Sequence, residues 1–208
     1  MSHSMTDYAF AETGGVPGAP LVFTFHGTGG DEHQFHDFPR QVLKDAHVIS
    51  PRGDISEHGA LRYFRRKAEG VYDMDDLWAR TAAMTEFVEA AKARVGAQRV
   101  VGMGYSNGAN ILAAVVMRAP HLFTDLAFLH PLIPWDPAPQ PGLQGARVLI
   151  TAGERDPICP APLTRSFESW MVAQGAEVDT LWHPGGHEIA QSEALALADF
   201  LAQTPKAR

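Results

Sequence analysis

Two kinds of apolar pattern alternate along the chain. Short continuous runs that are rich in β-branched or aromatic residues occupy residues 21–26, 46–51, 99–105, 125–130, 147–153 and 177–183. Continuous apolar runs of this length are typical of strands that are buried on both faces of a parallel sheet. We therefore expect each of these runs to form a strand of one sheet.

Segments with apolar residues about every 3.6 positions lie between these runs. In residues 75–96, Leu77, Met84 and Val88 fall on one helical face, and Gly96 is a natural helix stop. Similar patterns predict helices at 107–120, 162–175 and 187–203. The alternation of strand and helix predicts an α/β fold, with a mostly parallel central sheet and helices on both faces.

Polar and glycine-rich segments follow most of the predicted strands. In open α/β sheets, ligands bind beyond the carboxyl ends of the strands. The segments at these positions are "HGTGGDE" (26–32), "PRGD" (51–54), "SNGAN" (106–110), "HPLIP" (130–134), "GERDP" (153–157) and "HPGGH" (183–187). We expect the functional site at this edge of the sheet.

A serine lies between two glycines where a predicted strand meets a predicted helix. Gly104-Tyr105-Ser106-Asn107-Gly108 matches G-x-S-x-G, in which a sharp turn exposes the serine and leaves no room for side chains two positions away. The motif alone leaves a plain glycine-rich turn open as the alternative. A dinucleotide-binding loop fits less well, because Asn107 stands where its third glycine is required.

A nucleophilic serine needs a base and a group that orients the base. In this type of fold the chain order is serine, acid, histidine. Asp156 is preferred over Glu154 because its short side chain is easier to hold, and His187 is preferred over His183 because two glycines let its loop reach Ser106. The three residues occur in the required order on separate loops that follow strands, which favours a nucleophile over a turn.

Acyl transfer also needs two N–H donors for the developing oxyanion. One is expected from the backbone of Asn107, directly after the serine, and the other from the backbone of Thr28 in "HGTGG". The glycines around Thr28 permit the tight approach that this role requires.

Composition and charge narrow the function class. The chain has 208 residues, and its net charge of −7 argues against nucleic-acid binding. It lacks an apolar run of about 18 residues, so we expect no stable membrane association, and the absence of a visible signal peptide favours a cytoplasmic protein. We expect one domain over residues 1–208, with part of 1–12 disordered, as a monomer or homodimer.

The sequence offers little for a metal or an organic cofactor. His33 and His36 have metal-ligand spacing, but no third ligand accompanies them, and the single cysteine excludes a cysteine-based zinc site. We expect no metal and no cofactor.

The segments "HGTGGDE", "GYSNGAN", "AGERDP" and "GGH" resemble those of α/β-hydrolases of the phospholipase/carboxylesterase family, over about residues 20–200. The segments "PRG", "RYFRR" and "HPLIP" look like a bacterial branch linked to catechol or methylhydroquinone degradation or resistance. The resemblance implies an α/β-hydrolase fold without a large cap domain, a triad of Ser106, Asp156 and His187, and oxyanion donors at Thr28 and Asn107. Dienelactone hydrolases are similar in fold but use cysteine, so Ser106 makes lactone hydrolysis less favoured.

The long segment 51–77 is a candidate wall of the substrate pocket. Its basic and aromatic residues predict a pocket in which one arginine faces an anionic substrate group. The pocket candidates are Arg62, Tyr63, Phe64, Arg65 and Ile158. The alternative is that the arginines pair with the nearby acids Glu69, Asp73, Asp75 and Asp76 on the surface.

The function expected from these features is a serine esterase that hydrolyses small, soluble carboxylic esters through an acyl-enzyme on Ser106. A thioesterase or a lysophospholipase-like activity would use the same residues. A non-catalytic ligand-binding protein on a hydrolase fold remains the alternative from another class, since one fold hosts many functions.

Overall fold

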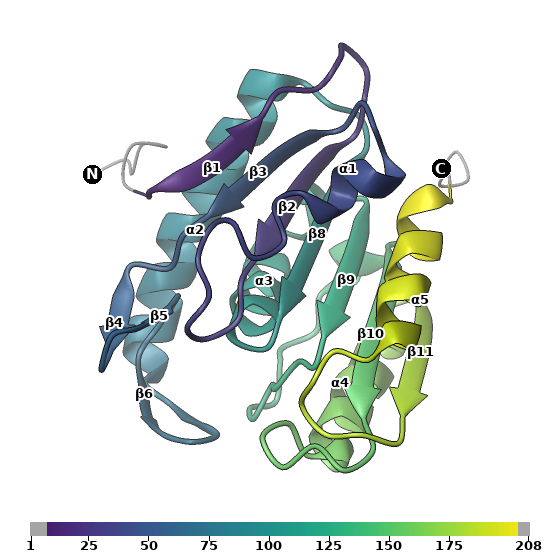
Figure 1. Cartoon of the computed structure of the whole chain (residues 1–208). Helices are drawn as coiled ribbons and strands as arrows, with labels where there is room; N and C mark the ends of the chain where they lie inside the picture. The colour runs from purple at the N-terminus through teal and green to yellow at the C-terminus, as the bar shows by residue number, and fades with distance from the viewer. Residues whose placement is uncertain (1–7, 204–208) are drawn as a thin grey trace.

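A computed structural model describes residues 8–203 of the chain and has one seven-stranded sheet at its centre (Figure 1). The strand order is β1-β3-β2-β8-β9-β10-β11, and all neighbours are parallel except the pair β1 and β3. The bounds are β1 Phe10–Thr13, β2 Leu21–Phe25, β3 His47–Pro51, β8 Val100–Tyr105, β9 Asp125–Leu129, β10 Arg147–Gly153 and β11 Glu177–His183. The six predicted strands are therefore confirmed.

Helices cover both faces of this sheet, as the alternating pattern predicted (Figure 1). The helices on one face are α2 Met74–Val95, α3 Asn107–Arg118 and α4 Ala161–Ala173, and those on the other are α1 Phe38–Val42 and α5 Gln191–Ala202. Short 3-10 turns follow at Pro120–Leu122 and Pro141–Leu143. The helix α2 ends as predicted, with Gly96 in the left-handed region at a φ of 70°.

The core lies in two layers because the central strands are apolar on both sides. Every residue of β2 and β9 is buried, which is what their continuous apolar runs predicted. The expectation of burial on both faces is wrong for β11, whose residues are mostly half-buried or exposed. The reason is its place in the sheet, since β11 is an edge strand that pairs only with β10.

The segment 51–77 contains structure that its sequence did not predict. It holds two small antiparallel hairpins, formed by β4 Ile55–Glu57 with β5 Ala60–Arg62 and by β6 Arg66–Ala68 with β7 Val71–Tyr72. Helix α5 begins at Gln191 instead of residue 187, and α1 was not predicted.

The described chain begins in ordered structure, and the expectation of disorder for part of 1–12 is not tested by it. Residues 10–13 form β1, which pairs with β3, and the ring of Tyr8 lies edge-on to Phe87 at a centroid distance of 5.7 Å. Residues 1–7 of that expectation lie outside the described residues. Within residues 8–203, no helix is long and apolar enough to cross a membrane.

Candidate active site

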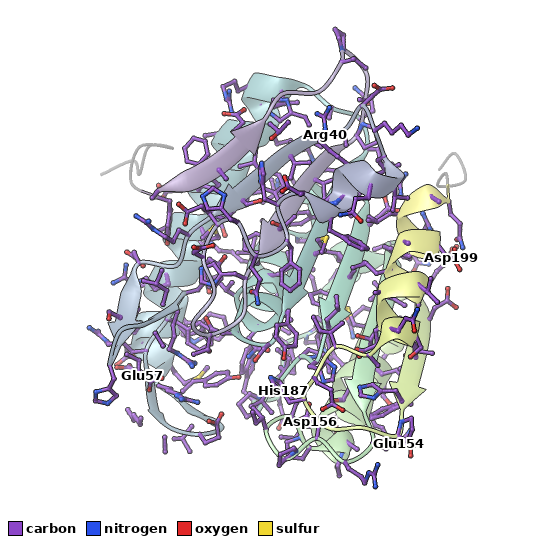
Figure 2. All side chains as sticks on the ribbon, viewed as in Figure 1. Arg40, Glu57, Glu154, Asp156, His187 and Asp199 are labelled. Carbon is purple, nitrogen blue, oxygen red and sulfur yellow. The ribbon has the colours of Figure 1, made fainter. Side chains whose placement is uncertain are left out.

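The side chains that the sequence singled out lie beyond the carboxyl ends of the parallel strands. Ser106 follows β8, Asp156 follows β10 and His187 follows β11, so the sheet order brings their loops to one edge. Figure 2 labels Asp156 and His187 near each other at the lower end of the sheet, whereas Glu57 is labelled on the left of the view, in β4. Parallel pairing thus gathers residues that are far apart in the sequence.

Ser106 lies on a strained turn between β8 and α3. Its φ and ψ are 52° and −118°, a combination that is rare for a residue with a side chain. A Cβ at Gly108 would lie 2.3 Å from the carbonyl oxygen of Phe25, and a Cβ at Gly104 would lie 2.6 Å from the backbone of Gly108. Both glycines are therefore required by close packing of the helix against two strands.

Three side chains form a hydrogen-bonded chain at this turn. The Oγ of Ser106 lies 2.9 Å from Nε2 of His187, and Nδ1 of His187 lies 2.7 Å from Oδ2 of Asp156. The chemistry of the partners assigns the protons: a carboxylate only accepts, so the Nδ1–H of His187 donates to Asp156, and Nε2 of the neutral ring then accepts from the serine hydroxyl. This arrangement can remove a proton from the serine and stabilise the imidazolium that results.

The carboxylate of Asp156 is buried and fully occupied. Its Oδ1 accepts hydrogen bonds from the backbone N–H groups of Ile158 and Cys159 at 2.8 and 2.9 Å. Burial alone would raise the pKa of Asp156, but hydrogen bonds from His130, His187 and the Cys159 N–H hold it well below its ordinary value. Asp156 is therefore ionised at neutral pH, as the orienting group of a base must be.

The loop that carries His187 is held in place, which differs from the expectation that two flexible glycines let it swing. The hydroxyl of Tyr105 donates to the carbonyl oxygen of His187 at 2.6 Å. Arg155 anchors the start of the loop, with its N–H on Gly185 O at 3.0 Å and its Nε on Pro184 O at 2.6 Å. His187 thus already lies in hydrogen-bonding contact with the serine.

The candidate oxyanion donors, Thr28 and Asn107, line the same cavity as Ser106. In the loop of Thr28, the N–H groups of Gly27, Gly29 and Gly30 donate to Gln34 Oε1, Leu61 O and Gly27 O. Among the described residues, the N–H groups of Thr28 and Asn107 have no such acceptor. Both are therefore free to donate to a ligand.

The cavity beside Ser106 has a volume of about 220 Å³. The predicted pocket residues Arg62 and Ile158 line it, together with Tyr72, Asn110 and Leu132. Three other predicted pocket residues, Tyr63, Phe64 and Arg65, do not line it.

These three residues lie elsewhere for clear physical reasons. Tyr63 and Phe64 are buried in the core, at 1% and 0% exposure, and the hydroxyl of Tyr63 donates to the carbonyl oxygen of Pro51 at 2.8 Å. The guanidinium of Arg65 is exposed and pairs with Asp76 at 3.1 Å. Tyr63 and Phe64 thus belong to the core, whereas Tyr72 of the same segment lines the cavity.

The remaining arginines also pair with acids, but the alternative interpretation holds only in part. Arg66 pairs with the predicted Glu69, whereas Glu57 was not a predicted partner and Arg62 is not on the surface. Arg66 contacts both oxygens of Glu57 at 3.0 and 3.1 Å and also pairs with Glu69. Arg62 is only 4% exposed, donates from Nη1 to Thr28 Oγ1 at 2.8 Å and lies 3.6 Å from Glu57. Two cations and two carboxylates therefore offset one another at this wall of the cavity.

Several polar residues of the site were missed at the level of sequence. The side chain of Asn110 donates to Tyr72 Oη at 2.8 Å and accepts from Leu132 N at 2.7 Å, which builds one wall of the cavity. His130 and Glu193 extend the buried network behind Asp156. The position of His130 directly after a strand was a signal for it, whereas no pattern pointed to Glu193.

The two histidines with metal-ligand spacing are not neighbours of this network. The ring of His36 is buried, and its two nitrogens lie 2.8 and 2.7 Å from the hydroxyls of Thr13 and Ser50. His33 is exposed and lies 3.8 Å from Glu32. Their ring contacts therefore explain them without a metal.

Comparison with known proteins places this geometry among hydrolases. Residues 60–197 match the profile of the dienelactone hydrolase family. The chain is 35% identical over 176 residues to the protein MhqD of Bacillus subtilis (strain 168), a match that covers 84% of this chain and 88% of MhqD.

Solved structures with the same architecture include proteins from two other bacteria. Atu2452 of Agrobacterium tumefaciens str. C58, a protein of unknown function, is 51% identical with a TM-score of 0.90, covering 97% of this chain and 98% of its own. The Bacillus cereus carboxylesterase is 31% identical with a TM-score of 0.85, and 93% of each chain is covered. The similarity therefore supports an α/β-hydrolase fold and hydrolase activity of the esterase kind.

Proposed function

The chain belongs to the dienelactone hydrolase family, and we propose that within it this protein is a serine esterase that hydrolyses small, soluble carboxylic esters through an acyl-enzyme on Ser106. The observation that carries the proposal is the continuous contact from Ser106 Oγ through His187 to Asp156, at 2.9 and 2.7 Å. The match to the Bacillus cereus carboxylesterase supports ester chemistry.

The first half of the proposed reaction forms the acyl-enzyme. Ser106 Oγ attacks the ester carbonyl carbon while its proton moves to Nε2 of His187, and Asp156 stabilises the imidazolium through Nδ1. The carbonyl oxygen gains negative charge and accepts hydrogen bonds from the N–H groups of Thr28 and of Asn107, the latter at the N-terminal end of α3. The bond to the alcohol then breaks, and the imidazolium returns its proton to the departing alkoxide oxygen.

The second half of the reaction uses the same groups in reverse. His187 removes a proton from a water molecule, whose oxygen attacks the acyl carbon. The bond to Ser106 Oγ breaks, the serine recovers its proton from His187, and the carboxylic acid product leaves. The held position of His187 supports both halves, because one base must serve the serine and the water in turn.

The single cysteine is a poor alternative nucleophile. Cys159 is buried, and its Sγ lies 3.2 Å from the carbonyl oxygen of His130. Burial and the nearby charge of Asp156 raise the pKa of its thiol far above the ordinary value. Because the thiolate is the reactive form, the serine is the favoured nucleophile in this member of the family.

The cavity supports short and uncharged esters. Its volume of about 220 Å³ is below the range that is common for pockets of drug-sized ligands, roughly 300–1,000 Å³. Arg62 shares Glu57 with Arg66, so it offers little net charge to an anionic substrate. We propose that Arg62 holds Thr28 in place for oxyanion binding, through the hydrogen bond to Thr28 Oγ1.

Labelling with a fluorophosphonate probe tests the proposed nucleophile. We expect one equivalent of label on the wild type, and none on Ser106→Ala at equal folded concentration. Labelling should be accompanied by a burst of alcohol release from an activated aryl ester. Failure of the wild type to react, or labelling that survives in Ser106→Ala, would contradict the esterase and favour a non-catalytic ligand-binding protein.

A further inference from the structure

A buried row of charged side chains continues behind Asp156. Nδ1 of His130 lies 2.8 Å from Oδ2 of Asp156, and Nε2 of His130 lies 2.9 Å from Oε1 of Glu193. All three side chains are 0% exposed. The proposed reaction needs only the serine, the base and the acid. His130 and Glu193 are therefore buried beside the site without a role in the steps described above.

The contacts of His130 indicate that it carries a proton on both nitrogens. A neutral imidazole has one N–H, yet both nitrogens here face carboxylate oxygens. The angles at Nε2 are poor for a hydrogen bond, so its contact with Glu193 is an ion pair. Burial lowers the pKa of His130, but the carboxylates of Asp156 and Glu193 that face its two nitrogens outweigh burial and raise the pKa to about 9.

The other titratable groups around His130 add no competing charge at neutral pH. Burial raises the pKa of Tyr105 to about 12 and keeps the thiol of Cys159 protonated. Nδ1 of His183 accepts the N–H of Gly185 at 3.0 Å, which leaves its proton on Nε2, facing Oε2 of Glu193 at 3.2 Å. The groups that face His130 are Asp156 from the loop after β10, Glu193 from α5, His183 from β11, His187 from its loop, Tyr105 from β8 and Cys159.

The backbone fixes both ends of this contact. Oε2 of Glu193 accepts the N–H of Ala190 at 2.6 Å, at the start of α5. His130 has a φ of 50°, a left-handed conformation that is rare for a residue with a side chain, and its N–H donates to Thr151 O at 2.8 Å. Such a conformation persists only where the surroundings determine it.

We propose that His130 and Glu193 are positioning residues for Asp156: the His130 imidazolium fixes the carboxylate that orients His187 and offsets part of its charge. Asp156 Oδ2 then receives one N–H from each histidine, 2.8 Å from His130 and 2.7 Å from His187. The inference rests on the proposed function, because it assigns a role to the surroundings of the proposed base.

The proposal has a consequence for the pH range of the reaction. The rings of His130 and His187 have centroids 5.1 Å apart, close enough for a cation on one to disfavour a cation on the other. Loss of the charge on His130 removes a cation beside the proposed base, so we expect the acid limb of the rate profile to move to higher pH.

Glu193→Gln removes the charge on His130 and keeps the contacts. A glutamine can accept from the Ala190 N–H with its oxygen and place its uncharged amide against Nε2 of His130. His130 is then neutral, and its Nδ1–H still donates to Asp156. The substitution therefore separates the charge of His130 from its position.

The pH profile of kcat/KM on an aryl acetate tests the proposal. For Glu193→Gln we expect the acid limb to move to higher pH by about one unit, with the alkaline plateau within about threefold of wild type. Nitrogen-detected NMR of the histidine rings should show two protonated nitrogens on His130 in the wild type at pH 7, and one in the variant.

Asp125→Asn is the matched control. Asp125 begins β9, at the opposite end of the strand that His130 follows, and its buried carboxylate pairs with Arg147 at 2.5 Å. We expect this variant to lose stability and to keep the acid limb of the wild type. A shift of equal size in Asp125→Asn would overturn the proposal, because loss of any buried carboxylate would then suffice.

Other outcomes would also overturn the positioning role. A Glu193→Gln profile that overlays the wild type would do so, as would a wild-type His130 with one protonated nitrogen at pH 7. Zinc retained by the wild type in a one-to-one ratio would make His130, His183 and Glu193 ligands instead. If the wild type is labelled at Ser106 and one of these three outcomes is observed, only the positioning role of His130 and Glu193 is refuted. If the wild type is not labelled at Ser106, the proposed esterase itself is refuted.

Discussion

Gly153 lies against Gly186, so that a Cβ at Gly153 would lie 2.0 Å from the Gly186 carbonyl oxygen. Gly153 ends β10, three residues before Asp156, and Gly186 precedes His187. This contact joins the loop of the proposed acid to the loop of the proposed base. The spacing of the two side chains thus depends on a close approach of two backbones.

Gly153→Ala should therefore push the His187 loop away from Asp156. We expect kcat/KM to fall at least about 100-fold, since a displacement of about 1 Å at a reacting group has effects of this size. Gly14→Ala is the control, because a Cβ there meets nothing within 4 Å. Unfolding in urea should show a loss of stability for Gly153→Ala and none for Gly14→Ala. Unchanged kinetics in Gly153→Ala would show that the close contact of the two backbones does not position His187.

Arg62→Met should lower kcat more than it raises KM. The variant loses the hydrogen bond that holds Thr28 Oγ1, and with it the position of one proposed oxyanion donor. Loss of one such donor typically costs about 100-fold in kcat. The rates on neutral and on anionic esters of the same size should fall in the same ratio. A selective loss on anionic esters would instead indicate that Arg62 binds a substrate anion.

The wild type should lose stability as the pH rises through about 9. The pKa of His130 is raised from 6.5 to about 9 in the folded state, so its contribution is fully present below about pH 6.5 and disappears as the folded-state imidazolium titrates. The raised pKa of His130 corresponds to a contribution on the order of 3 kcal/mol to the free energy of unfolding. Urea unfolding at pH 7 and pH 10 should show a larger decline for wild type than for Glu193→Gln, and equal declines would argue against a charged His130.

Short acyl chains should be the best substrates. Leu132 and Ile158 bound a cavity of about 220 Å³, which leaves little room beyond the reacting carbonyl. We expect kcat/KM for p-nitrophenyl esters to fall at least about tenfold between butyrate and decanoate. Leu132→Ala should raise the decanoate-to-butyrate ratio of kcat/KM, because it enlarges the wall. A ratio that does not change would mean that the acyl chain lies elsewhere.

The sequence by itself determined the strands of the central sheet other than β1, most of the helices, and the meeting of Ser106, Asp156 and His187. Apolar runs encode burial locally, and parallel strands end at one edge, so Ser106, Asp156 and His187 could be assigned to that edge from the order of their loops. The role of the two glycines of the turn could also be predicted, because the G-x-S-x-G motif itself leaves no room for side chains at Gly104 and Gly108. Local pattern and local geometry were sufficient in these cases.

Only the tertiary structure decided the rest. Tyr63 and Phe64 are of the residue types that commonly line pockets, but the packing of the hairpins β4–β5 and β6–β7 buries their side chains in the core. His130 meets Glu193 because β9 lies between β8 and β10 in the sheet and α5 crosses the face behind them. Contacts between charged groups on distant segments depend on the order of the strands and on the placement of the helices. The hydrophobic pattern of either segment alone does not predict that order or that placement.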